Sequence, residues 1–165
     1  MTATTSLKPI QRRLIGNGAA LIFVAGTIGF GFLFFLLGEI RLWPFPGTIS
    51  LQLPGSVKAW RMAHLEGVIN GLILWLTALL LPLLPFSQVA SRRVANGMIA
   101  VGWLFTLASL IDALFPNSRG LAMGGPWTNS LAFLMFYVGV LIVMAVMAII
   151  AWKTLVAKAP DNAND

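Results

Sequence analysis

Residues 14–37 read LIGNGAALIFVAGTIGFGFLFFLL, a run of 24 residues without a charged side chain. A helix needs roughly 20 apolar residues to cross the hydrocarbon core of a bilayer, so this run is long enough to span a membrane. It also exceeds the roughly 7–15 apolar residues of a secretory signal. The run is therefore expected to remain as a helix of the mature protein.

Three further segments of the same kind follow at about residues 57–84, 95–115 and 131–152. The first of these is expected to begin before its apolar core, because Ser56 after a Pro-Gly pair is typical of a helix N-cap. Soluble domains are about 45–50% apolar and about 25% charged, whereas this chain is 58% hydrophobic and 10% charged. The sequence therefore predicts an all-α integral membrane protein with four transmembrane helices.

The four helices leave no room for a separate soluble domain, so we expect a single transmembrane domain over residues 1–158. Residues 159–165, APDNAND, are predicted to form a disordered tail. In the first loop, residues 48–53 alternate apolar and polar side chains, which predicts a short extended segment.

The basic residues indicate how the helices are oriented. Seven of the eleven Lys and Arg residues fall in the N-terminal tail, the second loop and the C-terminal segment, against four in the first and third loops. Cytoplasmic loops carry the excess of positive charge, so both termini are predicted to be cytoplasmic. The basic residues stand at the ends of apolar runs and are not interleaved with aromatic residues, which indicates a lipid bilayer as partner and argues against nucleic acid.

The composition also limits the chemistry. The chain has no Cys and one His. Iron–sulfur clusters, covalently attached haem, disulfides and thiol catalysis all need Cys, and a zinc site built on several His ligands needs more than one. The only metal centre that a single His can hold without further protein ligands is one whose other ligands come from a cofactor. Haem b, iron protoporphyrin IX, fits because the porphyrin supplies four.

His64 is the candidate metal ligand, and it is expected to lie two turns inside the second helix. The alternative is a hydrogen-bonded structural histidine, which is the commoner use of a lone His near an interface. Trp60, Gly67 and Gly71 fall on the same helical face and form a strip with two small residues. A flat ligand could approach such a strip, so these three residues are the candidate cofactor contacts.

Polar residues inside apolar spans need a partner or a function. Asn70 lies about 120° around the helix from His64, where it could bond a neighbouring helix or reach a substrate beside a cofactor. Asp112 and Ser109 form part of a polar ridge near the end of the third span. The carboxylate either extends to the membrane edge and pairs with Arg119 or belongs to an active site.

Several motifs resemble the bacterial styrene oxide isomerase family, whose members are small four-span membrane proteins. The order, spacing and length agree over about residues 10–158. The motifs are LPGSVKAWRMAH at 53–64, Asn70-Gly71, Gly102-Trp103 and PNSRGL at 116–121.

The resemblance implies a trimer of four-helix protomers in a bacterial inner (cytoplasmic) membrane, with haem b between protomers. It implies a ferric iron that acts as a Lewis acid, so that an epoxide opens to a carbocation and a 1,2-hydride shift gives an aldehyde. His64 matches the axial haem ligand of the family. Asn70 matches a polar residue near the substrate oxygen.

Two positions depart from the family pattern, because its distal Tyr falls at Ser109 and its helix-three Asp falls at Val101. We expect an epoxide isomerase with Asn70, Asp112 and Ser109 as candidate catalytic residues. Asp112 is expected to take over part of the role of the Tyr and Asp side chains that this sequence lacks. The alternatives are a haem-binding sensor, carrier or electron-transfer protein on the same scaffold, and a membrane scaffold without haem. In the first alternative the haem would bind a ligand other than a small apolar epoxide. In the second there would be no haem and no haem ligand.

Overall fold

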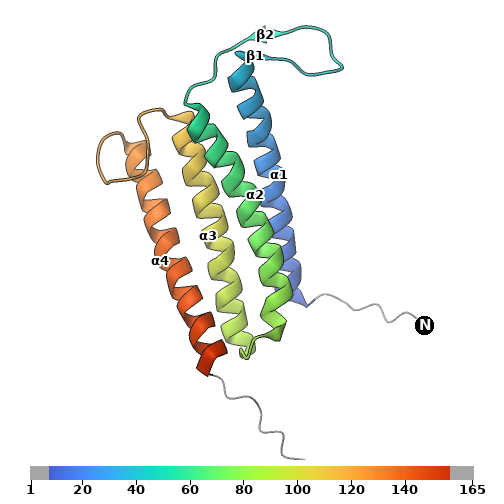
Figure 1. Ribbon diagram of the computed structural model, residues 1–165, viewed down its shortest axis with the longest axis vertical. Helices are drawn as coiled ribbons and strands as arrows, with labels where there is room; N and C mark the ends of the chain where they lie inside the picture. The colour runs from blue at the N-terminus through green and yellow to red at the C-terminus, as the bar shows by residue number, and fades with distance from the viewer. Residues whose placement is uncertain (1–7, 157–165) are drawn as a thin grey trace, which may run out of the picture.

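The computed structural model describes residues 8–156, which form four long helices and a two-stranded sheet (Figure 1). The helices are α1 (Pro9–Leu37), α2 (Val57–Leu80), α3 (Gln88–Leu114) and α4 (Trp127–Val156), and a short 3-10 helix, η1 (Leu81–Leu83), continues α2. All four long helices are long and apolar enough to cross a membrane. The prediction of an all-α protein with four spans is confirmed. The tail predicted at residues 159–165 lies outside the described residues.

Three of the helices begin or end beyond their apolar runs. The helices begin at Pro9, Gln88 and Trp127, before the spans predicted from about residues 14, 95 and 131, because an apolar run marks only the part of a helix that hydrocarbon would cover. α3 begins at Gln88, where the Ser87 hydroxyl accepts a hydrogen bond from the Ala90 amide at 3.3 Å. The predicted start of α2 is confirmed, since the Ser56 hydroxyl accepts from the Ala59 amide at 3.2 Å.

The helices run up and down and pack in chain order, α1 on α2, α2 on α3 and α3 on α4 (Figure 1). α1 also touches α3, and the Trp103 indole joins them by donating to Asn17 Oδ1 at 2.9 Å. α4 lies at the far edge of the bundle and packs on α3. This arrangement leaves a space between α2, α3 and α4 near the end of the bundle that carries the first and third loops.

Glycines allow α1 and α2 to pack closely. A Cβ atom on Gly67 would lie 2.7 Å from the Ala25 Cβ, and one on Gly71 would lie 2.8 Å from the Gly18 carbonyl oxygen. No larger side chain fits at either position unless the helices separate. The close contact fixes the rotation of α2 against α1, and therefore the direction in which each α2 side chain points.

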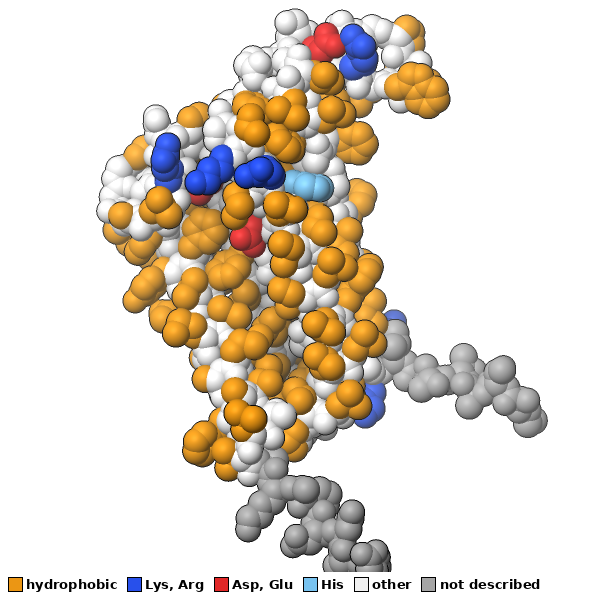
Figure 2. All heavy atoms as spheres, viewed as in Figure 1, with side chains coloured by type: hydrophobic (Ala, Val, Ile, Leu, Met, Phe, Trp, Pro, Cys, Tyr) orange, Lys and Arg blue, Asp and Glu red, His pale blue; other side chains and the backbone are white. Residues whose placement is uncertain are grey.

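Hydrophobic side chains cover the middle of the molecule, and the Lys and Arg side chains lie towards its two ends (Figure 2). This is the surface expected of a protein that meets lipid around its middle. In the first loop, β1 (Glu39–Ile40) pairs antiparallel with β2 (Ile49–Ser50). Of the extended segment predicted at residues 48–53, residues 49–50 form a strand, β2.

Candidate functional site

His64 lies on the side of α2 that faces α1. Its Nδ1 atom is 2.9 Å from the Ala25 carbonyl oxygen. A carbonyl oxygen only accepts hydrogen bonds, so Nδ1 carries the proton and Nε2 keeps its lone pair. This is the arrangement found in metal-binding histidines, whose second nitrogen is held by a backbone carbonyl or a carboxylate.

Two glycines of α1 make room for the aromatic rings of α2. A Cβ on Gly29 would lie 3.0 Å from His64 Nδ1, and one on Gly31 would lie 2.7 Å from the Trp60 ring. Gly29 therefore allows the imidazole to reach the Ala25 carbonyl. No motif predicted this role, because a glycine in an apolar span is first interpreted as a contact between helix backbones.

Trp60 is a core residue. It is 3% exposed, its indole donates to the Pro54 carbonyl at 2.8 Å, and its ring stacks on Phe35 at 6.1 Å between centroids. The ring of Trp60 is therefore covered within the chain itself, and its assignment as a cofactor contact stays a prediction.

The strip formed by Gly67 and Gly71 is also covered within the chain. Both glycines are buried and face α1, whose Ala25 and Ile22 side chains fill the space beside them. Within the described residues this strip faces α1, and the approach of a flat ligand to it stays a prediction. Its small residues serve helix packing, and of the four predicted cofactor residues only His64 keeps a free polar atom.

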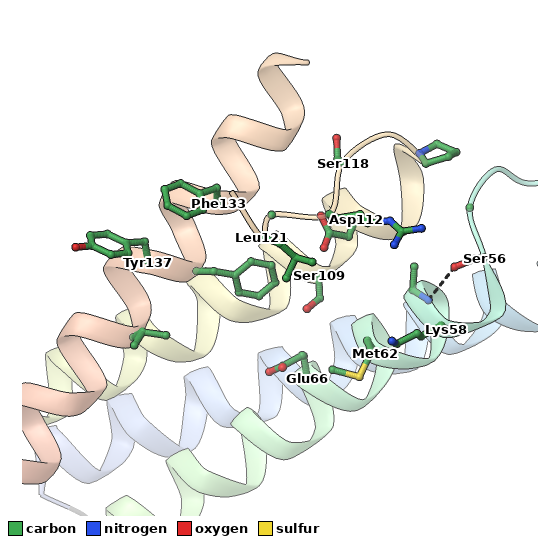
Figure 3. A pocket seen from close by; sticks show the side chains of 17 residues that line it. Ser56, Lys58, Met62, Glu66, Ser109, Asp112, Ser118, Leu121, Phe133 and Tyr137 are labelled. Atoms are coloured by element: carbon green, nitrogen blue, oxygen red, sulfur yellow. Dashed lines mark hydrogen bonds between the residues drawn. The ribbon is translucent and has the colours of Figure 1, made fainter. Parts of the chain in front are cut away.

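A pocket of about 620 Å³ opens between α2, α3, α4 and the third loop (Figure 3). Its polar side chains are the carboxyl groups of Glu66 and Asp112, the hydroxyls of Ser56, Ser109 and Ser118, and the cationic groups of Lys58 and Arg119. Phe133, Phe136 and Tyr137 on α4 provide an aromatic wall. The pocket therefore has an apolar side suited to a hydrocarbon and a polar side with two carboxyl groups.

Asn70 lies behind the polar side of the pocket. It is 6% exposed, and its amide donates to Glu66 Oε2 at 2.8 Å and to the Glu66 carbonyl at 2.8 Å. Of the two alternatives for Asn70, a bond to a neighbouring helix is not found among the described residues, because both bonds stay within α2. Asn70 reaches the pocket through Glu66, a residue that was not predicted as a site residue although it stands four positions before Asn70.

Asp112 and Ser109 both line the pocket, as an active-site role requires. The Oδ1 atom of Asp112 is buried and has no hydrogen-bond partner among the described residues. The predicted ion pair with Arg119 is absent from the described part of the chain, where the one ion pair joins Arg41 and Glu39. Val101 is 2% exposed and belongs to the core, not to the pocket.

The third loop closes the pocket at the membrane edge, and one side chain holds it. Asn129 Oδ1 accepts from the Arg119 and Gly120 amides at 2.9 and 3.0 Å. Its Nδ2 donates to the Ala122 and Gly124 carbonyls at 2.9 and 2.7 Å. These four bonds use the full capacity of an Asn side chain. The sequence reasoning missed Asn129, since a polar residue at a helix start looks like an ordinary loop residue.

His64 and the pocket lie on two flanks of α2. Residues 64 and 66 point about 200° apart at 100° per residue, and His64 is not among the residues that line the pocket. In Figure 2 the histidine and a nearby acidic side chain appear on the same face of the molecule, separated by other side chains. Within this chain the histidine therefore does not reach the pocket.

Comparison with known proteins agrees with this architecture. A sequence model described as "Styrene oxide isomerase" matches residues 10–155. A styrene-oxide isomerase of Pseudomonas fluorescens is 28% identical over 156 residues, which cover 90% of this chain and 90% of that protein. The match includes all four helices and the pocket between them. The chain therefore belongs to the styrene oxide isomerase family.

Proposed function

We propose that this protein isomerises an epoxide to an aldehyde or ketone, with haem b held by His64 as cofactor. Membership of the family makes the chain an isomerase, and the curated relative is named for styrene oxide. The observation that carries the cofactor proposal is the 2.9 Å contact of His64 Nδ1 with the Ala25 carbonyl, which leaves Nε2 as a free ligand atom.

The surroundings of His64 fit a large flat cofactor with acidic groups. The exposed face of α2 between His64 and the pocket carries Met62, Leu65 and Ile69, which are 44%, 41% and 50% exposed. Arg61 precedes His64 by one turn and is exposed, so it is placed to pair with a porphyrin carboxylate. When bound, ferric haem would supply a Lewis acid for the epoxide oxygen.

The pocket fits the substrate side of the reaction. The rearrangement breaks one C–O bond and moves a hydride to the neighbouring carbon, so atoms balance without a co-reactant. The carbon that loses oxygen becomes positive, and the carboxyl groups of Glu66 and Asp112, which line the pocket together with Lys58 and Arg119, would stabilise that charge. The ring faces of Phe133 and Phe136 add a cation–π contribution. Apolar walls also keep out water, which would divert the cation to a diol.

A homo-oligomer, most simply a trimer, explains how His64 and the pocket come together. The two lie on different flanks of α2, so an interface that joins the histidine flank of one protomer to the pocket flank of the next is heterologous. Heterologous interfaces close into rings when the rotation between neighbouring protomers permits it, and a trimer is such a ring.

The charge distribution supports an orientation with both termini in the cytoplasm of a bacterial-type inner membrane. Among the described residues, six cations lie at the end of the bundle where α1 begins and α4 ends. They are Lys8, Arg12, Arg13, Arg92, Arg93 and Lys153. Four basic residues lie at the other end, so the positive-inside rule favours the first end as cytoplasmic.

A spectrum and a product analysis of the purified wild-type protein test this function together. We expect a Soret band of about one haem per protomer and an aldehyde from styrene oxide. Haem without product from any aryl or alkyl epoxide would favour a haem sensor, carrier or electron-transfer protein. Neither haem nor product would favour a scaffold.

A further inference from the structure

A second pocket, of about 720 Å³, lies at the opposite end of the bundle from the first. It is formed by the start of α1, by η1 and the turn after it, and by the first turns of α3. The side chain of Gln11 ties two of these parts together, since its Nε2 donates to the Ala78 carbonyl near the end of α2 at 3.2 Å. The pocket is thus a feature of the packed bundle and not of a loose loop.

The mouth of this pocket is cationic. Lys8 and Arg92 line it, together with the polar side chains of Gln88 and Ser91. Arg12, Arg13, Arg93 and Lys153 stand at the same end of the bundle. The described acidic residues lie in the other half of the bundle, Glu39 in β1, Glu66 in the third turn of α2 and Asp112 near the end of α3. The positive charge here is therefore not neutralised by the described part of the chain, and an anion would complement it.

The remainder of the pocket is apolar. Leu81, Leu84 and Phe86 come from η1 and the turn after it, and Ile10 and Val89 come from the first turns of the two adjoining helices. The surface therefore changes from basic to hydrophobic within a single cavity. A soluble anion uses only the basic part of such a site, whereas an amphiphile with an anionic head and an apolar chain uses both.

We propose that this pocket binds one anionic phospholipid, with the phosphate between Lys8 and Arg92 and an acyl chain along the leucine and phenylalanine side chains. The pocket lies where the spans end, which is the depth of the headgroup layer. Basic pockets between transmembrane helices on the cytoplasmic side are typical lipid headgroup sites. The bound lipid connects the start of α1 to the α2–α3 turn and thereby stabilises the bundle at that end.

Native mass spectrometry of the full-length protein in detergent, titrated with phosphatidylglycerol or phosphatidylcholine, tests the proposal. We expect one phosphatidylglycerol adduct per protomer and no comparable phosphatidylcholine adduct. The double variant Lys8→Gln/Arg92→Gln should weaken the phosphatidylglycerol adduct about 10–30-fold, as expected for two lost charges. The charge-conserving variant Lys8→Arg/Arg92→Lys should retain it, which separates a binding effect from a folding defect.

The matched control is Arg13→Gln/Lys153→Gln, which removes the same charge from the same end but outside the pocket lining. Both side chains are exposed and neither lines the pocket, so at physiological salt, which screens exposed charges, the adduct should be nearly unchanged. Equal losses in the two charge-removing variants would show general surface attraction and overturn the proposal, as would no loss in either. Glycerol phosphate should not compete at equal concentration. If it competes as well as the lipid, the site binds a soluble phosphate ester and the lipid proposal is wrong.

Discussion

The Nδ1 atom of His64 on α2 lies 2.9 Å from the carbonyl oxygen of Ala25 on α1. The contact sets the tautomer of the imidazole and leaves the other nitrogen free. It also links the candidate cofactor ligand to the tightest helix pair in the bundle, where Gly67 and Gly71 exclude any larger side chain. The ligand atom is therefore held by the fold before any cofactor binds.

We predict that His64→Ala abolishes stoichiometric haem binding and leaves the helical fold intact. The chain has one His and no Cys, so no second imidazole or thiolate can replace His64 as a haem ligand. The Soret absorbance per protomer and the far-ultraviolet circular dichroism of purified protein are the measurements. Imidazole added to the variant should restore part of the band. A full Soret band in the variant without imidazole would remove His64 as the ligand.

Gly29→Val should lower haem occupancy by displacing the histidine ring. A Cβ at this position already lies 3.0 Å from His64 Nδ1, and overpacking of this kind costs about 1–3 kcal/mol. Gly26→Val is the matched control, because a Cβ at Gly26 has nothing within 4 Å. Haem occupancy and the position of the Soret band are compared in the two variants. Equal behaviour would mean that Gly29 does not position the imidazole.

Asp112→Asn should lower turnover by up to about 10² while haem occupancy stays unchanged. The carboxyl group lines the pocket with one buried, unpartnered oxygen, so it is available to a developing positive charge. Turnover is measured on haem-matched samples. Glu39→Gln is the control, since Glu39 lies in β1 away from the pocket and pairs with Arg41. An Asp112→Asn variant with wild-type turnover would exclude the carboxylate from the reaction.

Asn129→Ala should release the third loop, whose residues 118–121 line the pocket. Four hydrogen bonds are lost, and at about 0.5–1.5 kcal/mol each the loss of unfolding free energy is about 2 kcal/mol or more. Thermal unfolding should shift down, and KM should rise more than kcat falls. Asn96→Ala, at an exposed position on α3, serves as comparison. If both variants unfold at the wild-type temperature, Asn129 does not hold the loop.

Much of the fold could be predicted from the sequence because each span is a long run of apolar residues, a signal that needs no knowledge of neighbours. The site was harder to predict, because helical spacing shows on which face of a helix a residue lies but not which neighbouring element covers that face. Gly67 and Gly71 lie on the face predicted for them, yet α1 fills the space beside them. Asn129 and Gly29 act through loop and helix contacts that no local pattern records.

Glu66 also shows that helical spacing alone does not identify a site residue. Its spacing from Asn70 predicts that the two side chains meet, and they do, at 2.8 Å. That the carboxylate also faces a pocket depends on where α3 and α4 pack, which comes from contacts far apart in the sequence. Ser109 and Asp112 were predicted as site residues because a polar side chain inside an apolar span is costly unless it has a partner or a function.

The central claim is that the pocket rearranges an epoxide without exchange with water. The most direct measurement is the fate of styrene oxide carrying two deuterium atoms on its terminal carbon, followed early in turnover by mass spectrometry and NMR of the product. A 1,2-shift predicts phenylacetaldehyde with one deuterium on the aldehyde carbon and one on the benzylic carbon. A diol, or an aldehyde that carries no deuterium on its benzylic carbon, would contradict the account.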